Sequence, residues 1–323
     1  MSDVAIGIDV GGTKALALLV TRDGRVLGEA NAATPHDDAS APGEATTRVL
    51  ANQVETLCRS LRLDPASIPI GLGLPGMMRR DGHLAYAPNL QSASGAELGT
   101  QLATLLGSAL VVVDNDANCA ALAEHEWGAA RGVRDFVMVT LGTGIGGGVF
   151  VDDQLVRGQS GFAGEIGHMV VVAHGAACPC GGHGCWERYA SGGGLQRLVL
   201  EAAREGRLNA LASAAGGAEH LRPEDVTESA RRGSGEAQAL LAEMGWWLAL
   251  GLSNLSAILD CGHFVIGGGL SSAADLFLPA TRDAIAKLVE GYDARPTITV
   301  ATSLFGPRSG AMGATLVAFE RLA

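Results

Sequence analysis

One short pattern occurs twice in this chain of 323 residues: an apolar strand runs into a glycine-rich turn and returns as a second and then a third strand. The two turns, residues 11–14 and 142–148, lie about 130 residues apart. The expected strands cover residues 4–10, 15–20 and 25–30 in the first copy and 136–141, 149–151 and 155–156 in the second. Such a repeat predicts an internally duplicated fold with one copy in each of two domains.

Helices alternate with strands in the rest of the chain, which is the pattern of the α/β class. Apolar spacing predicts strands over 70–74, 110–113 and 264–266 and helices over 41–61, 117–127, 192–211, 236–259 and 311–322. We expect Asp116 to be the N-cap of the helix over 117–127. The predicted small domain comprises residues 1–117 and about 305–323, and the predicted large domain comprises residues 118–304.

The composition excludes several classes of partner. The net charge is −11 and Lys14 and Lys287 are the only lysines, so we expect no binding to nucleic acid or to an anionic membrane. No apolar run reaches the roughly 18 residues of a membrane span. Residues 1–3 lead into an expected strand without a basic segment, so we expect no secretory signal and a cytoplasmic protein.

Both glycine turns are candidate phosphate-binding loops, because glycine lets backbone N–H groups converge on an anion and a threonine hydroxyl adds a donor. The first comprises Gly11, Gly12, Thr13 and Lys14, and the second runs from Gly142 through Thr143 and Gly144 to Gly147. A glycine hairpin without a ligand has the same pattern. The second turn also matches G-x-G-x-x-G, but a strand follows where a dinucleotide-binding fold needs a helix. The Walker pattern is excluded because Ala15 follows Lys14.

Two aspartates follow apolar strands, at the sheet edge where α/β proteins collect their ligands. Asp9 directly precedes the first glycine turn, where a carboxylate suits Mg²⁺ bound to a polyphosphate. Asp116 follows Asn115 and opens a helix, where a carboxylate stays ionised and can act as general base toward a hydroxyl group. The alternatives are a turn cap for Asp9 and a helix cap for Asp116.

The six cysteines form two groups. Three lie scattered among apolar residues and are expected to be buried and unreactive: Cys58, Cys119 and Cys261. The other three crowd into one short stretch, which in a reducing compartment indicates a metal before a disulfide: Cys178, Cys180 and Cys185. Redox activity of this second group is the alternative.

One imidazole would complete a closed Cys₃His zinc site, whose role is structural because no position is left for water. His168 is the favoured fourth ligand, and His183, enclosed between glycines, is the alternative. Glu165 and Glu187 flank the ligand positions, so a zinc-braced loop would hold two carboxylates as hydrogen-bond acceptors for a polyol.

Taken together, these motifs resemble the ROK family of sugar kinases, from Ile6 to about Gly313. The most specific part is Glu165-x-x-His168 followed by the Cys178-x-Cys180 segment, which ends in Cys185-x-Glu187. Three further segments occur in the family's order: Asp9-Val-Gly-Gly-Thr-Lys14, Asn115-Asp116-Ala117-Asn118 and Leu141-Gly-Thr-Gly-x-Gly146. The segment from Cys180 to Gly192 looks most like the bacterial glucokinases of the family.

The resemblance implies a duplicated actin-like/hexokinase (ribonuclease H-like) fold with two domains around a central cleft, with Asp116 as catalytic base and Asp9 near Mg²⁺. The implied ATP-binding residues are Asp9, Gly11, Gly12, Thr13, Lys14, Gly142, Thr143, Gly144, Gly267, Gly268 and Gly269. The implied sugar-binding residues are Gly76, Asn89, Asn115, Asp116, Glu165, His168 and Glu187. The implied ligands of a structural Zn²⁺ are His168, Cys178, Cys180 and Cys185.

The activity implied by the resemblance is transfer of the γ-phosphoryl group of MgATP to the C6 hydroxyl of D-glucose. The expected partners are a small-molecule sugar and ATP, and we expect a homodimer or homotetramer. One departure concerns the sugar loop: family members often carry a tryptophan after Pro-Asn-Leu, whereas small or polar residues 91–95 follow Leu90 here.

Three alternatives differ in class or substrate. An N-acetylglucosamine or N-acetylmannosamine kinase of the same family would use the same chemistry. A sugar-sensing repressor of the family would need a helix-turn-helix domain, and Asp9 lies too close to the start of the sequence to leave room for one. A nicotinamide dehydrogenase is suggested only by the accidental G-x-G-x-x-G match.

Overall fold

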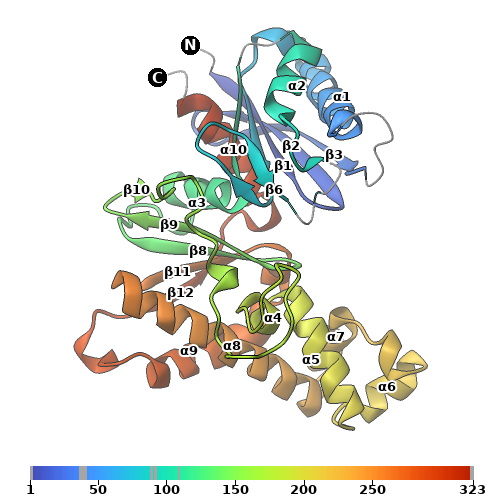
Figure 1. Cartoon of the computed structure of the whole chain (residues 1–323), viewed down its shortest axis with the longest axis vertical. Coiled ribbons are helices and arrows are strands. Elements are labelled where there is room, and N and C mark those ends of the chain that lie inside the picture. Colours follow the sequence, from blue (N-terminus) through green and yellow to red (C-terminus); the bar gives the residue numbers. More distant parts are fainter. Residues whose placement is uncertain (1–2, 36–41, 88–89, 91–92, 108–109, 321–323) are drawn as a thin grey trace. The chain divides into compact units, whose positions relative to one another are not determined.

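The chain divides into two compact units in a computed structural model that describes residues 3–35, 42–87, 90, 93–107 and 110–320 (Figure 1). The first unit comprises residues 1–134, 147–164 and 303–323, and the second comprises 135–146 and 165–302. These units differ in extent from the two domains expected from the sequence, whose boundary after residue 117 stays a prediction.

The sheet of the first unit has the strand order β3-β2-β1-β4-β7. Its strands are β1 (Val4–Val10), β2 (Lys14–Thr21), β3 (Val26–Ala33), β4 (Ile70–Leu74) and β7 (Val111–Asn115). Strands β1, β2 and β3 are antiparallel, whereas β1, β4 and β7 run parallel. The register pairs Asp9 with Gly73 and Gly73 with Asp114. The carboxyl ends of three parallel strands therefore bring two sequence-distant acidic segments to one edge.

The second sheet, β10-β9-β8-β11-β12, repeats this order with an antiparallel glycine-turned hairpin followed by parallel strands. Its strands are β8 (Phe136–Leu141), β9 (Ile145–Val151), β10 (Gln154–Leu155), β11 (His263–Gly267) and β12 (Thr299–Thr302). The repeated topology confirms the duplication that the two glycine turns predict. A two-stranded ribbon, β5 (Met77–Met78) with β6 (Leu84–Tyr86), lies in the first unit.

Helices cover both faces of the first sheet (Figure 1). These helices are α1 (Glu44–Leu61), α2 (Leu98–Leu106), α3 (Asp116–Glu126) and α10 (Ser309–Glu320). Ile6 and Ile8 of β1 pack with the buried leucines of α1 and α2. Leu16 and Leu18 of β2, on the opposite face, pack with α3 and α10. Alternating strand side chains therefore enter two separate apolar layers.

The second unit is mainly helical outside its strands. Its helices are α4 (Glu187–Ala190), α5 (Gly192–Arg204), α6 (Asn209–Ala215), α7 (Pro223–Arg231), α8 (Gly235–Leu259) and α9 (Ala274–Leu288). No helix in the described part of the chain is both long and apolar enough to cross a membrane.

Helix α10 lies unusually close to the sheet. A Cβ at Gly71 would clash with the carbonyl oxygen of Ala314, and a Cβ at Gly313 would clash with the carbonyl oxygen of Cys119 on α3. Glycine at these positions therefore lets backbone pack directly on backbone. The N-terminal end of α10 reaches the carboxylate of Asp9, since a Cβ at Gly310 would lie 2.6 Å from its Oδ2.

The sequence predictions of elements need three corrections. The single helix predicted over 192–211 is two helices, α5 and α6, separated near Gly206 with its φ of 75°. Strand β9 begins at Ile145 instead of residue 149, so Gly148 lies within the strand. A Cβ at Gly148 would clash with Ala121 of α3. Helix α10 begins at Ser309, two residues before the predicted start.

Candidate functional site

The N-terminus of α3 holds the candidate base of the first unit. Asn115, and not Asp116 as predicted, is the N-cap: its side-chain oxygen accepts from the N–H groups of Ala117 (2.9 Å) and Asn118 (3.1 Å). Asn115 also donates from Nδ2 to the carbonyl oxygen of Gly76 at 3.0 Å. Asp116 is the first helical residue, and its Oδ1 accepts from the N–H of Ala117 at 2.8 Å. The capping role is thus filled by its neighbour.

A buried ion pair fixes the strand end that precedes this helix. Asp114 accepts from Arg157 through Nε (3.0 Å) and a terminal nitrogen (2.7 Å) on one carboxylate oxygen. Its other oxygen accepts from Asn118 Nδ2 at 3.0 Å and from the N–H of Asn115 at 2.7 Å. Four donors satisfy the buried carboxylate, and the backbone before Asp116 is held from both sides. The sequence analysis missed this network, although a carboxylate inside an apolar strand signals that a donor must reach it.

Asp9, at the end of β1, has a strongly perturbed ionisation. Burial and the charge of Asp116 raise the pKa of Asp9 to about 7, and Lys14 opposes the rise. The carboxylate is therefore half protonated near neutral pH in the ligand-free protein. A divalent cation bound beside it would favour the ionised form, which is the behaviour expected of a metal-binding carboxylate.

The first glycine turn is pinned to the following strand. The Gly11 N–H donates to the carbonyl oxygen of Lys14 at 2.9 Å, and Thr34 Oγ1 donates to the carbonyl oxygen of Gly11 at 2.8 Å. The Thr34 N–H also donates to the carbonyl oxygen of Thr13 at 3.1 Å. The side chains of Thr13 and Lys14 remain exposed. The turn is thus rigid and presents polar groups to solvent.

The second glycine turn is fixed to the start of α5 in the second unit. The N–H groups of Gly192 and Gly193 donate to the carbonyl oxygens of Gly142 (2.8 Å) and Thr143 (3.1 Å). Ser191, the N-cap of α5, donates from Oγ to the same Thr143 oxygen at 2.9 Å. The backbone N–H groups at the N-terminus of α5 therefore hold the second glycine turn in place.

The third glycine segment lies beside the second turn. Gly267 ends β11 opposite Thr140 of β8. Gly268 has a φ of 79° and packs on the backbone of Leu141, the residue before the second turn. A Cβ at Gly269 would meet no atom within 4 Å, so the surface above it is open. Both glycine segments of this unit thus meet at the carboxyl ends of neighbouring strands, which matches a nucleotide-binding edge.

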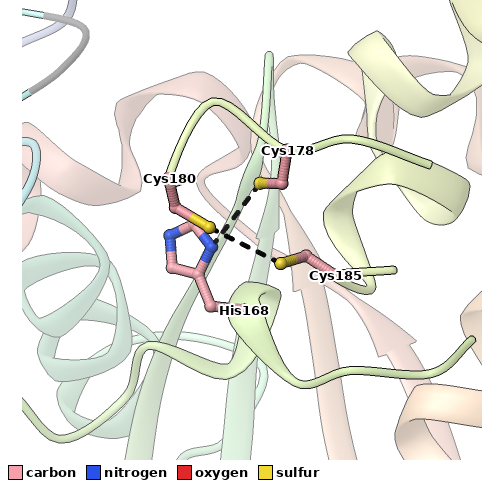
Figure 2. A group of neighbouring side chains, drawn as sticks. All are labelled: His168, Cys178, Cys180 and Cys185. Atoms are coloured by element: carbon pink, nitrogen blue, oxygen red, sulfur yellow. Dashed lines mark hydrogen bonds between the residues drawn. The ribbon is translucent and has the colours of Figure 1, made fainter. Parts of the chain in front are cut away.

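Four side chains of the second unit converge as a metal site would require: His168, Cys178, Cys180 and Cys185 (Figure 2). Their ligand atoms all lie within 4.8 Å of one another. The sulfur atoms of Cys180 and Cys185 are 3.6 Å apart, and Cys178 Sγ lies 4.0 Å from His168 Nδ1. Two sulfurs held tetrahedrally at about 2.3 Å from one zinc would lie about 3.8 Å apart. The donor set and its spacing therefore fit Zn²⁺, and the cluster contains His168 instead of His183.

Two carboxylates border this cluster. Glu165 Oε2 lies 3.8 Å from His168 Nε2, and Glu187 Oε1 lies 3.8 Å from His168 Nδ1. Burial raises the pKa of Glu165, with His168 opposing and Glu187 adding to the rise. Cys178 donates to Glu187 Oε1 at 3.0 Å. The N–H of Gly182 lowers the pKa of the exposed Cys180, whereas burial raises the pKa of Cys178 and of Cys185.

A buried tryptophan anchors the loop that carries these residues. Trp186 is fully buried between Cys185 and Glu187 and donates from Nε1 to the carbonyl oxygen of Trp247 at 2.8 Å. A Cβ at Gly251 of α8 would clash with its indole ring. The indole ring therefore packs against α8 at Gly251, where no side chain is present. This packing holds the adjacent residues Cys185 and Glu187 in place. The sequence analysis did not single out Trp186. The available signal was the position of a tryptophan between Cys185 and Glu187, two residues already expected to be functional.

The predicted site residues thus form one set in each unit. The first unit assembles Asp9, Gly11, Gly12, Thr13, Lys14, Gly76, Asn115 and Asp116 at the edge formed by β1, β4 and β7. The second unit assembles Gly142, Thr143, Gly144, Gly267, Gly268 and Gly269 near β8 and β11, together with Glu165, Glu187 and the four cluster residues. Asn89 lies outside the described residues.

The raised pKa of Asp9 makes stability depend on pH. Between about pH 4 and 7 the ligand-free folded protein keeps a proton that the unfolded chain has lost, so the free energy of unfolding falls as pH rises through this window. We expect Asp9→Asn to gain stability relative to the wild type from pH 4.5 to pH 8. Thermal melting without nucleotide checks this, with the exposed Asp283→Asn as control. A parallel pH dependence of Asp9→Asn and wild type would contradict the assignment.

Known proteins resemble this chain over nearly its whole length. The model of the ROK family matches residues 5–321. Glucokinase of Streptomyces coelicolor is 34% identical over 321 residues, which are 98% of this chain and 98% of that protein. N-acetyl-D-glucosamine kinase of Shigella boydii is 33% identical over 279 residues, which are 82% of this chain and 84% of that protein.

A solved structure agrees with these relatives. The crystal structure of a ROK family glucokinase from Streptomyces griseus, in complex with glucose and AMPPNP, superposes with a TM-score of 0.86. It is 32% identical to this chain and the match covers 98% of this chain and 99% of that one. The duplicated α/β fold of the actin-like/hexokinase type is thereby confirmed. The motifs, the topology and the whole-length family match agree: the chain belongs to the ROK family.

Proposed function

We propose that the protein is a glucokinase, which transfers the γ-phosphoryl group of ATP to the C6 hydroxyl of D-glucose. The observation that carries the proposal is the position of Asp116, in the first turn of α3, beside Asp9 at the sheet edge. The relatives' names, and the glucose and ATP analogue in the Streptomyces griseus structure, support the same chemistry. Assembly into a homodimer or homotetramer remains part of the proposal.

Asp116 is the proposed general base. Asn115, and not Asp116, caps the helix, and the helix N-terminus favours the ionised form of the Asp116 carboxylate. It would accept the proton of the C6 hydroxyl as the oxygen attacks the γ-phosphorus in line. The ion pair of Asp114 with Arg157 holds the preceding backbone, which limits the misplacement of this base.

The glycine turns are the proposed sites for the ATP phosphates. Their backbones are pinned by Thr34 in one unit and by Ser191 in the other, so their donors need little reorganisation when an anion binds. Asp9 would hold Mg²⁺ that arrives with ATP, and this ion supplies neutralisation of charge on the phosphate oxygens. Gly267 to Gly269 would lie against the nucleoside, with open space at Gly269.

The proposed sugar-binding groups come from both units. Asn115 and Asp116, with the Gly76 backbone and Asn89, belong to the first unit, and Glu165, His168 and Glu187 belong to the second. Carboxylates accept hydrogen bonds from adjacent sugar hydroxyls, so the pair of glutamates suits a polyol. The Cys₃His cluster would bind a structural Zn²⁺ whose role is to fix the loop that presents these groups.

A second candidate, an N-acetylhexosamine kinase, is favoured by the 33% identity to N-acetyl-D-glucosamine kinase. The N-acetyl group at C2 adds a methyl and a carbonyl that need space, and the small or polar residues that follow Leu90 in the sequence would suit such a group. Similarity of the segment from Cys180 to Gly192 to glucokinases makes glucose the preferred substrate.

The role of Asp116 is checked by Asp116→Asn. We expect kcat to fall by about 10²–10⁴-fold, because the amide cannot accept the hydroxyl proton. The glucose Kd should change little, since the amide still forms hydrogen bonds. Coupled measurement of ADP release and calorimetric titration of glucose test both points. Glu126→Gln, an exposed carboxylate on the same helix, is the control. A kcat within a few-fold of the wild type would leave Asp116 without a catalytic role.

The metal proposal predicts about one Zn²⁺ per chain in protein purified without chelator. His168→Ala and Cys180→Ser should lose the metal and the activity together, because Glu165 and Glu187 depend on the braced loop. His183→Ala should keep the metal, since His183 is exposed and outside the cluster. Elemental analysis of the purified variants measures their zinc content. Loss of zinc in His183→Ala with retention of zinc in His168→Ala would reverse the ligand assignment.

The preference for glucose over N-acetylated sugars is the most specific part of the proposal. A site that pairs every sugar hydroxyl discriminates against an analogue that leaves its polar groups unpaired. We therefore expect kcat/KM for glucose to exceed that for N-acetylglucosamine and N-acetylmannosamine by at least about tenfold, or 1.4 kcal/mol. Equal or higher efficiency with either N-acetylated sugar would overturn the choice of substrate and leave the kinase mechanism intact.

A further inference from the structure

Glu124, near the C-terminal end of α3, is a charged side chain that the proposed mechanism does not use. It is fully buried, and none of the ion pairs among the described residues includes it. A carboxylate without a cation is costly to bury unless several donors surround it. Its partners therefore identify what the buried charge holds in place.

Backbone and hydroxyl donors converge on Glu124 from two distant segments. Oε2 accepts from the N–H groups of Ala129 (2.9 Å) and Leu304 (3.0 Å). Oε1 accepts from the N–H of Phe305 (3.2 Å) and from Ser303 Oγ (2.6 Å). The Ser309 hydroxyl lies 3.0 Å from the same oxygen. Hydrogen bonds to an ionised acceptor are about twice as strong as neutral ones, so this cluster is a firm attachment.

These two segments lead to two of the four points at which the chain passes between the units. Residues 127–134 lead from α3 to the point where the chain enters the second unit, after Arg134. Residues 303–309 lead from the second unit into α10, after the chain returns at Ser303. One carboxylate therefore fastens both connections to the same end of α3.

Gly128 makes room for this arrangement. A Cβ at Gly128 would clash with Oε2 of Glu124, and its N–H donates to the Glu124 carbonyl oxygen at 3.2 Å. The N–H of Ala130 donates to the same carbonyl at 2.9 Å. A side chain at position 128 would thus displace the carboxylate without altering its charge. This gives a second, independent way to disturb the attachment.

The attachment also joins the elements that carry the proposed catalytic groups. Helix α3 begins with Asp116, and α10 begins at Ser309, next to Gly310 against the Asp9 carboxylate. The Glu124 contacts at the far end of α3 therefore fix how α3 lies along α10.

We propose that Glu124 is a positioning residue for phosphoryl transfer, which holds α3 along α10 and thereby keeps Asp116 in register with Asp9. This inference rests on the proposed function. A misplacement of about 1 Å can cost about 10²-fold in rate, whereas binding of each ligand to its own groups is less sensitive. Loss of the anchor should therefore lower kcat more than it raises either KM.

The test compares Glu124→Gln and Gly128→Ala with the wild type and with Glu126→Gln, the exposed control on the same helix. An amide at position 124 cannot accept at both of its ends, so the backbone N–H groups at one end lose their acceptor and the attachment is weakened. We expect kcat for glucose phosphorylation to fall about tenfold or more, with the KM values for glucose and ATP within about threefold. Hydrogen exchange of the Ala129, Leu304 and Phe305 amides should accelerate in both variants and stay unchanged in the control.

Ser303→Ala is the milder variant, which removes one donor and keeps the carboxylate, and it decides the matter should Glu124→Gln not fold. It should accelerate exchange at Leu304 and Phe305 and lower kcat by about threefold. A lower melting temperature with kcat per folded molecule within about twofold of the wild type would reduce Glu124 to a stabilising residue and overturn the proposal. Absence of glucose-dependent ADP release in the wild type would instead refute the proposed function, while the exchange data would still decide whether Glu124 anchors the connections.

Discussion

Direct contact of backbone with backbone around α10 is the constraint on which the first unit depends. Gly71 lets the carbonyl oxygen of Ala314 approach β4, and Gly313 lets α10 approach the carbonyl oxygen of Cys119 on α3. No larger side chain fits at either position, so α10 can occupy only one depth and one register on the sheet. That register sets the start of α10 against Asp9 and keeps α3, with Asp116, beside it.

The buried carboxylates of the first unit differ in the hydrogen-bond donors and charges that surround them. This difference distinguishes carboxylates with a structural role from the one proposed to bind a cation. Asp114 accepts from a guanidinium and from two further donors, and Glu124 accepts from backbone amides and hydroxyls. Asp9 instead lies close to the like charge of Asp116, with a pKa raised to about 7 by burial and by that charge. A carboxylate that the fold leaves under-compensated is the one that a cation can stabilise most.

Local signals in the sequence account for the parts of the structure that depend on neighbouring residues. The strands next to both glycine turns, the helix after Asn115 and the cluster of His168 with three cysteines follow from periodicity, turn chemistry and ligand spacing. The contacts of Asp114 with Arg157, of Glu124 with residues 303–309 and of Trp186 with Gly251 do not. They join segments tens to hundreds of residues apart, and no short-range pattern encodes which buried charge meets which donor. Whether Asn115 or Asp116 caps α3 likewise depends on a shift of the helix start by one residue, which the sequence pattern does not resolve.

In the second unit the Cys₃His cluster and the second glycine turn are parts of one structure. Glu187 accepts from Cys178 on one oxygen, and its other oxygen packs so closely on Gly144 that a Cβ there would clash with it. Its carbonyl oxygen and that of Thr143 both accept from Ser191 Oγ, at 2.6 Å and 2.9 Å. A displacement of the cysteine loop must therefore move Glu187, and Glu187 cannot move toward the turn without displacing Gly144. A structural metal at this place would influence nucleotide binding as well as sugar binding, through packing and without touching either ligand.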